Sequence, residues 1–129
     1  MIDPAIRQLL EQAIDSPIKL QLLLLFHENP RSELTAHQVA NRTFRDIWST
    51  RDALRELHED GVLAVGTGAG EPTYRYQPRA EHVEHIARLV HSFNEPIERD
   101  SVHTVLRQIA DEAFYRRALH KSAFEHQVL

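Results

Sequence analysis

Residues 35–76 constrain the fold of this chain more than any other segment, because they carry the signals of two short helices, a turn and a β-hairpin in that order. Thr35 is placed to cap the first of these helices. Gln38 follows three residues later, so its side chain can reach back to the Thr35 backbone and complete a capping box. The turn that ends this helix is expected at residues 41–45.

A second helix is predicted from residue 47 to about residue 60. Asp46 is placed to cap its start, and Gly61 is the kind of residue that commonly ends a helix. Along this segment apolar residues recur at steps of three and four, which is typical of a helix with one buried face. The residues expected on that face are Ile47, Thr50, Ala53, Leu54 and Leu57.

A β-hairpin is predicted directly after this second helix, over residues 62–76. Residues 62–65 form a short apolar run, and Thr73–Tyr76 are rich in residues that strands favour. The loop between them contains three glycines at alternate positions. Glycine-rich loops can cradle phosphate, but such loops open a helix, whereas this one leads into Pro72 and a strand. We therefore expect the tip of a hairpin.

Two helices are predicted before this unit. Asp3 and Pro4 have the pattern of a helix start, with the aspartate as cap and the proline at the first helical position. Ser16 and Pro17 repeat the same device for the next helix. That helix, expected over residues 17–27, is so rich in leucine that it should be the central buried helix of the fold.

The last third of the chain is also predicted to be helical, to about residue 119, with a kink or restart at residues 94–96. It would form a C-terminal extension over residues 80–129, next to a domain over residues 1–79. Its apolar residues recur at helical spacing and form one seam. The residues of this seam are Val83, Ile86, Val90, Phe93, Val102, Val105, Leu106, Ile109, Ala113 and Phe114.

This order of elements resembles the winged helix-turn-helix of bacterial transcriptional regulators, and residues 54–63 are its most specific part. The chain is also similar to a group of small, largely uncharacterised bacterial winged-helix proteins. They share the Tyr-Arg-Tyr-x-Pro pattern of residues 74–78 and a tail segment similar to residues 109–114. The resemblance implies a mainly α fold with a small β-hairpin, a winged helix-turn-helix with flanking N- and C-terminal helices. It also implies a DNA-binding transcriptional regulator.

In a winged helix-turn-helix, the second helix lies in the major groove of duplex DNA and its N-terminal residues reach the base edges. Here that is helix 47–60, with the wing at residues 62–76. Its two outward arginines are one turn apart, a spacing suited to base contacts, and the arginines before the helix and on the wing are suited to phosphates. The predicted DNA-binding residues are Arg42, Arg45, Trp48, Ser49, Arg51, Asp52, Arg55 and Arg75.

The charge pattern is less favourable to this interpretation. The chain has a net charge of −4, and helix 47–60 has two arginines and four acidic residues. Residues 31–79 contain seven arginines and seven acidic residues. Because affinity for DNA depends on neutralising phosphates, the arginines would have to be separated in space from the acidic side chains. A basic stripe along Arg42, Arg51 and Arg75 would meet that requirement.

Trp48 supports a different function. An exposed indole is more typical of a protein interface than of base recognition. The alternative is therefore a winged-helix protein-protein interaction module that uses the face around Trp48, with Phe44 also exposed. A third interpretation is structural, with Trp48 and Phe44 folded back against the helices, because tryptophan is rarely left fully exposed.

The composition excludes several other classes. The chain has no cysteine, which excludes disulfides, thiolate metal sites and cysteine nucleophiles and is compatible with the cytoplasm, the expected location. No signal-peptide pattern is visible at the N-terminus. The longest apolar run, residues 22–26, is too short to cross a membrane. Because no catalytic pattern is present, we predict neither enzyme activity nor a cofactor.

His82 and His85 are the one pair that suggests metal chemistry. Two imidazoles three residues apart on a helix can share a metal ion, but a site needs further ligands. We expect this face to be solvated, because Val83, Ile86 and Val90 occupy the opposite side. No metal site is predicted, and a metal-responsive switch is the alternative.

The apolar seam of the C-terminal helices needs a surface that covers it, either the core of the same chain or a second subunit. A homodimer through the terminal helices is predicted, because paired winged-helix domains match the two-fold symmetry of operators. The predicted partners are thus duplex DNA and a second copy of this chain, and no membrane.

Overall fold

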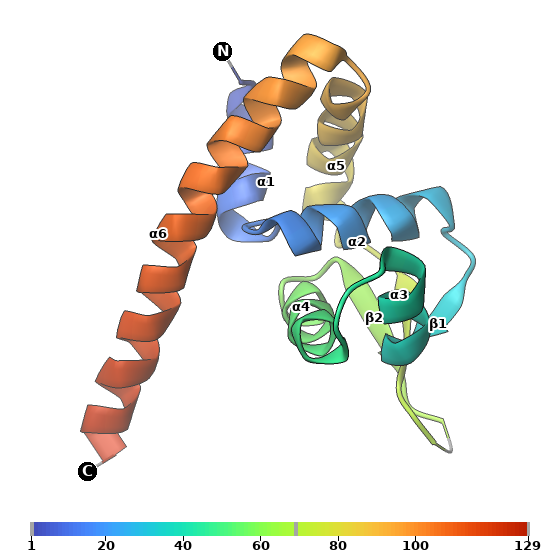
Figure 1. The fold of residues 1–129 in the computed structure, drawn as a ribbon, viewed down its shortest axis with the longest axis vertical. Helices are drawn as coiled ribbons and strands as arrows, with labels where there is room; N and C mark the ends of the chain where they lie inside the picture. The colour runs from blue at the N-terminus through green and yellow to red at the C-terminus, as the bar shows by residue number, and fades with distance from the viewer. Residues whose placement is uncertain (1, 69, 129) are drawn as a thin grey trace.

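A computed structural model of the protein describes residues 2–68 and 70–128. In this part of the chain, six helices and a small sheet form the predicted mainly α fold, a winged helix-turn-helix with helices on both sides (Figure 1). The elements in chain order are α1 (Pro4–Gln12), α2 (Pro17–Glu28), β1 (Glu33–Thr35), α3 (Ala36–Thr43), α4 (Ile47–Glu59), β2 (Leu63–Gly66), β3 (Thr73–Tyr76), α5 (Ala80–Phe93) and α6 (Pro96–Val128).

The starts of the first four helices are the ones predicted from the capping residues. The Asp3 and Ser16 side chains accept hydrogen bonds from backbone N–H groups in the first turns of α1 and α2. At α3, Thr35 and Gln38 form the complete capping box. The Asp46 side chain caps α4 by accepting a hydrogen bond from the Ser49 backbone N–H. These short-range hydrogen bonds satisfy backbone donors that a helix start leaves unpaired.

α2 is the central helix of the fold, as predicted. α1, α5 and α6 pack on one side of it, and α3, α4 and the sheet lie on the other (Figure 1). Leu22, Leu23 and Phe26 are fully buried within it. One hydrophobic core therefore extends from the N-terminal helix through α2 into α4 and α6. The predicted division of the chain at residue 79 stays a prediction.

The hairpin is part of a three-stranded antiparallel sheet with the order β1-β3-β2. The prediction of β2 and β3 is confirmed, but β1 was not predicted. In the sheet register Leu34 lies opposite Tyr74, and its side chain is buried. A strand of three residues is too short to show an alternating pattern, so its pairing with β3 depends on contacts far along the chain.

The turn between α3 and α4 is shorter than predicted. Residues 41–43 are helical and not part of the turn, which contains only Phe44 and Arg45 before the cap residue Asp46. The buried Thr43 hydroxyl donates to the Val39 carbonyl oxygen at 2.8 Å and so holds the last turn of α3 closed. Phe44 ends the helix with a φ of 55°, in the left-handed region.

α5 and α6 are the two predicted C-terminal helices, separated near Pro96, but their buried faces differ in part from the prediction. On α5 the buried residues are His82, Ile86 and Leu89, whereas Val83 is exposed. The reason is a hydrogen bond between His82 Nε2 and the carbonyl oxygen of Asp60, 2.9 Å apart, which rotates His82 toward α4. The expectation that His82 lies on a solvated face is therefore wrong.

The seam of α6 is confirmed where side chains are described, at Val102, Leu106, Ile109 and Ala113. The side chain of Phe114 lies outside the described part. The helix continues to Val128, past the predicted end near residue 119, and its last turns extend beyond the rest of the protein (Figure 1). Across residues 2–68 and 70–128, none of the helices is both long enough and apolar enough to cross a lipid bilayer.

Candidate nucleic-acid interface

α4 presents one polar face to solvent and buries the other. Thr50, Ala53, Leu54 and Leu57 are buried and Ile47 is partly buried, as predicted. At its start Asp46 Oδ2 accepts a hydrogen bond from the Ser49 backbone N–H at 2.7 Å. This hydrogen bond favours the charged carboxylate and lowers the pKa of Asp46. The predicted candidates on the outward face, all exposed, are Trp48, Ser49, Arg51, Asp52 and Arg55.

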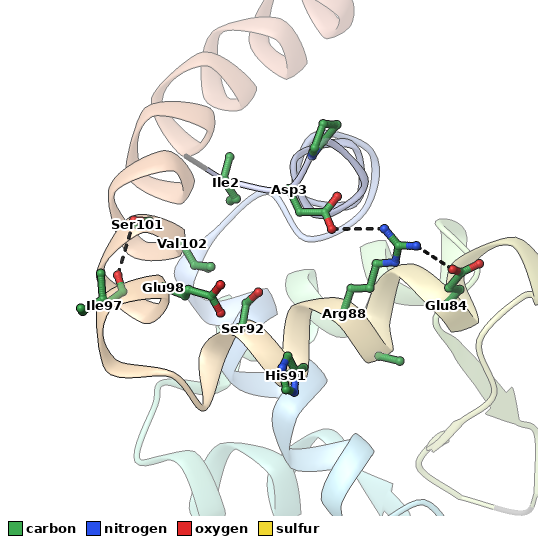
Figure 2. Close-up of a pocket in the computed structure, with 12 residues that line it drawn as sticks. Ile2, Asp3, Glu84, Arg88, His91, Ser92, Ile97, Glu98, Ser101 and Val102 are labelled. Carbon is green, nitrogen blue, oxygen red and sulfur yellow. Dashed lines mark hydrogen bonds and ion pairs between the residues drawn. The ribbon is translucent and has the colours of Figure 1, made fainter.

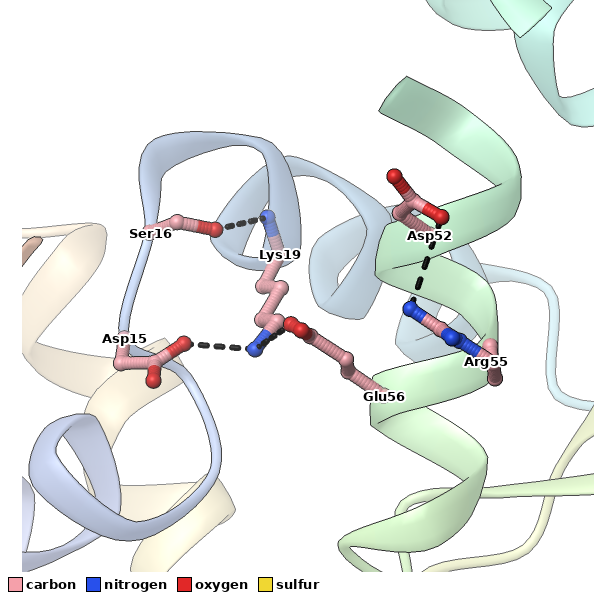
Figure 3. A network of polar contacts seen from close by, with 6 residues as sticks. All are labelled: Asp15, Ser16, Lys19, Asp52, Arg55 and Glu56. Carbon is pink, nitrogen blue, oxygen red and sulfur yellow. Dashed lines mark hydrogen bonds and ion pairs between the residues drawn. The ribbon is translucent and has the colours of Figure 1, made fainter. Parts of the chain in front are cut away.

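Not all of the acidic residues of α4 lie on this outward face. Glu56 points inward, and its Oε2 lies 2.5 Å from Nζ of Lys19 on α2 (Figure 3). The same ammonium lies 2.6 Å from Asp15 Oδ1, and the Lys19 side chain is almost completely buried. The count of four acidic residues in this helix therefore overstates the negative charge that α4 presents to a partner.

Arg51 and Arg55 differ in their surroundings. The Arg55 guanidinium lies 3.5 Å from Asp52 Oδ1, one turn earlier on the helix (Figure 3). Arg51 is instead placed over the ring of Trp48, with 5.9 Å between the guanidinium carbon and the ring centroid. Within the described residues, Arg51 forms no ion pair with an acid. Its charge is therefore available to an external anion.

Trp48 and Phe44 do not fold back against the helices. The exposed fraction is 72% for Trp48 and 96% for Phe44. The structural interpretation of these two aromatic residues is therefore wrong. The reason is the backbone of the turn, because the left-handed conformation of Phe44 directs the chain into α4 while its side chain points away from the core.

A groove of about 410 Å³ lies between α4 and the wing. Three of the predicted α4 residues, Arg51, Asp52 and Arg55, line this groove together with residues that were not predicted. Glu71 is one of these, and its carboxylate lies 2.7 Å from His37 Nδ1, which connects the wing to α3. This contact could not be predicted from local sequence patterns, because 34 positions separate the two residues. The residues that line the groove are Ala36, Arg51, Asp52, Arg55, Glu71, Pro72 and Tyr74.

The other three predicted arginines lie outside this groove. Arg42 is exposed in the last turn of α3, and Arg45 in the turn donates from Nε to the Gln21 side chain at 2.5 Å. Arg75 follows Tyr74 in β3, so its side chain points to the opposite face of the sheet, where it lies 3.8 Å from Glu33. Arg42, Arg51 and Arg75 therefore do not form one continuous stripe along the groove.

The predicted histidine pair, His82 and His85, lies in the first two turns of α5. Among the described residues, no three histidine, aspartate or glutamate side chains are grouped so that they could hold a metal ion. His82 is already engaged with the Asp60 carbonyl oxygen. This leaves no structural support for a metal-responsive switch at this pair.

A second hollow, an open cavity of about 860 Å³, lies between the N-terminus, α5 and α6 (Figure 2). Arg88 lines this cavity, and its guanidinium nitrogens lie 2.9 Å from Glu84 Oε1 and 3.2 Å from Asp3 Oδ2. These two carboxylates raise the pKa of Arg88. The arginine therefore joins α5 to the start of α1 and offers little charge to an anionic ligand.

The fold is similar to one that has been solved by crystallography. It matches the crystal structure of a MepR mutant from a multidrug-resistant S. aureus clinical isolate with a TM-score of 0.55 and 15% sequence identity. The match covers 98% of this chain and 88% of that chain. Comparison of the sequence with protein-family models gave no match, and comparison with curated proteins gave none.

The likeness extends over nearly the whole chain, so it includes the flanking helices as well as the winged unit. At this level of identity it shows the fold alone. The fold is a winged helix. The narrower resemblance to small proteins with a Tyr-Arg-Tyr-x-Pro wing strand stays a prediction.

Proposed function

We propose that this protein is a DNA-binding transcriptional regulator that binds duplex DNA through α4 and the wing. One observation carries the proposal: the exposed charged residues between positions 42 and 55 are four arginines and two aspartates. The acidic residue Glu56 is turned inward to Lys19. The first half of α4 and the turn before it therefore form a locally basic surface on a chain of net negative charge.

Each arginine has a proposed role. Arg51 and Arg55 line the groove beside the wing and enter the major groove, where a guanidinium can donate two hydrogen bonds to one guanine. Asp52 holds the Arg55 guanidinium in place for this contact. Ser49 lies in the first turn of α4, within reach of base or phosphate. The arginines proposed to bind phosphates are Arg42, Arg45 and Arg75.

We also propose that the protein binds DNA as a homodimer in the cytoplasm. The support for the dimer is the shape of α6, a helix of 33 residues whose last turns extend past the rest of the protein (Figure 1). Val83 on α5 and Ile97 on α6 are exposed apolar residues. A two-fold dimer through these helices would present two copies of α4 to two DNA half-sites.

The test is the binding of fluorescent duplex DNA at a series of salt concentrations, followed by anisotropy. Phosphate contacts predict a steep loss of affinity with salt. Arg51→Ala and Arg55→Ala should each weaken binding to a selected duplex by about 1–3 kcal/mol. Arg7→Ala is the matched control, since Arg7 is an exposed arginine in an intrahelical ion pair on α1. If both α4 variants keep full affinity, this helix is not the interface.

The second candidate is a protein-protein interaction module that uses the face around Trp48. The observation that favours it is the exposure of Trp48 and Phe44, which are four positions apart in the chain. Under this alternative, duplex DNA should not bind even at low salt, and Trp48→Ala should abolish capture of the partner. A salt-dependent DNA complex that needs Arg51 would contradict it.

A further inference from the structure

The turn before α4 and the first turn of α4 expose two large aromatic side chains that the fold does not use. Phe44 is 96% exposed and Trp48 is 72% exposed. Burial of such side chains normally stabilises a protein, so their exposure in the free protein brings no stability. Phe44 also occupies the left-handed region at φ 55°, which costs a residue with a Cβ atom free energy that glycine would avoid. The left-handed backbone of Phe44 ends α3, but its exposed ring is not packed in the described fold.

The surroundings of the two rings define the chemistry of their partner. Arg42 and Arg45 flank Phe44 in the chain, and the Arg51 guanidinium lies over the Trp48 ring. The acid between them, Asp46, already accepts the Ser49 N–H. A partner of this surface is therefore anionic around its edge and apolar where it meets the rings.

Two aromatic side chains are a small surface for a protein partner. A stable protein interface buries roughly 800 Å² on each side, about twice the area that two aromatic side chains can bury. Because Trp48 lies in the first turn of α4, one turn before Arg51 in the groove beside the wing, the observations favour nucleic acid.

The major groove of DNA offers one apolar group, the C5-methyl group of thymine. We propose that Trp48 and Phe44 contact thymine methyl groups, so that this protein selects sites with thymine next to the base bound by Arg51. This inference rests on the proposed function and adds the base that the interface selects. Burial of each methyl group between DNA and an aromatic ring supplies the affinity, and the arginines supply the attraction to phosphate.

The experiment compares thymine with uracil, which lacks only the methyl group. A duplex is selected from a random library with the full-length protein and then remade with uracil in place of every thymine. The wild-type protein should bind the uracil duplex about fourfold more weakly for each buried methyl group that is lost. Trp48→Ala and Phe44→Ala should bind the thymine duplex more weakly and should discriminate less between the two duplexes.

The control variant is Arg7→Ala, which truncates an exposed side chain on α1, outside the groove between α4 and the wing. Its discrimination between thymine and uracil should equal that of the wild-type protein. Trp48 is the only tryptophan of the chain, so its fluorescence gives a second measurement. The emission should change when the thymine duplex binds.

Three results would overturn the inference. Equal affinity of the wild-type protein for both duplexes would show that no methyl group is read. If Trp48→Ala and Phe44→Ala distinguish the thymine duplex from the uracil duplex as well as the wild-type protein does, other residues read the methyl group. A change in Trp48 emission with an acidic, leucine-rich peptide, but not with DNA, would assign the rings to a protein partner. If no duplex binds at any salt concentration, the proposed function itself fails, and the two failures are thus distinguishable.

Discussion

Lys19 is a buried lysine at the contact between α2 and α4. Its ammonium lies 2.6 Å from the Asp15 carboxylate and 2.5 Å from that of Glu56 (Figure 3). Removing a charge from water is costly, and only close partners compensate for it. The three residues therefore hold the α1–α2 corner and the middle of α4 at a fixed distance, which sets the position of the proposed DNA-binding helix.

Lys19→Met should lower the free energy of unfolding by about 3 kcal/mol, because it removes the ammonium that both carboxylates contact. Urea denaturation followed by circular dichroism measures this loss. The matched control is the triple variant Asp15→Asn, Lys19→Met, Glu56→Gln, which removes all three charges and should recover most of the stability. A triple variant as unstable as Lys19→Met would show that the charges are not responsible.

Phe44 is a second residue at which a substitution should change the stability of the protein. Phe44→Gly should raise the free energy of unfolding by up to about 1 kcal/mol, because glycine adopts the left-handed conformation without strain. Phe44→Ala keeps the Cβ atom and serves as the control, with stability close to that of the wild-type protein. Equal stability of the glycine and alanine variants in urea denaturation would contradict the strain argument.

At the scale of the element, α4 is defined by its two ends. Asp46 caps its start, and Gly61 follows its end with a φ of 82°, a left-handed conformation that is strained for a residue with a side chain. The wing is held to α3 through the contact of Glu71 with His37. In the proposed interface, the start of α4 is therefore held by Asp46, and the wing is held by the contact of Glu71 with His37.

The charge on Asp46 makes its contribution to stability dependent on pH. Its pKa is lowered below the usual 3.8, chiefly by the Ser49 N–H. The contribution is therefore fully present above the unfolded pKa and is lost as the pH falls through the folded pKa. Asp46→Asn should be less stable than the wild-type protein near neutral pH, and the difference should shrink below about pH 4. Urea denaturation at a series of pH values measures it.

The cap of α3 provides the control for this pH dependence. Thr35→Ala removes a cap that carries no charge, so it should cost about 1 kcal/mol at every pH. A difference between Asp46→Asn and wild type that stays constant to low pH would contradict the role of the Asp46 charge.

At the scale of the whole molecule, α2 connects two groups of elements. On one side are α3, α4 and the sheet, which carry the proposed interface. On the other are α1, α5 and α6, of which α5 and α6 carry the proposed dimer contact (Figure 1). The Lys19 contact crosses from the α1–α2 corner to α4, so it connects the two groups.

The dimer proposal predicts the effect of a charge on the terminal helices. Ile97→Glu and Val83→Glu place carboxylates on exposed apolar positions of α6 and α5, and together they should convert the dimer to a monomer in sedimentation equilibrium. Phe44→Glu is the control, because it changes an even more exposed apolar residue, in the turn between α3 and α4. A monomeric wild-type protein, or a dimer unaffected by the double change, would contradict the proposal.

The sequence by itself determined the helix starts and the succession of elements. The caps at Asp3, Ser16, Thr35 and Asp46 act on N–H groups two or three residues away, and helical periodicity is equally local. Such short-range signals are present in the sequence before any tertiary contact forms. The winged helix-turn-helix could therefore be predicted, and with it the outward positions of Arg51 and Arg55.

Only the tertiary structure decided which polar and aromatic groups face the proposed interface. Glu56 turns inward because Lys19 lies on another helix, and β1 exists because Leu34 is paired with Tyr74, 40 positions away in the chain. Trp48 stays exposed because no element of the described fold covers it. These outcomes depend on contacts between residues far apart in the sequence, and such contacts cannot be predicted from local periodicity. The sequence therefore predicted the elements, and the packing of those elements decided the charge and shape of the surface.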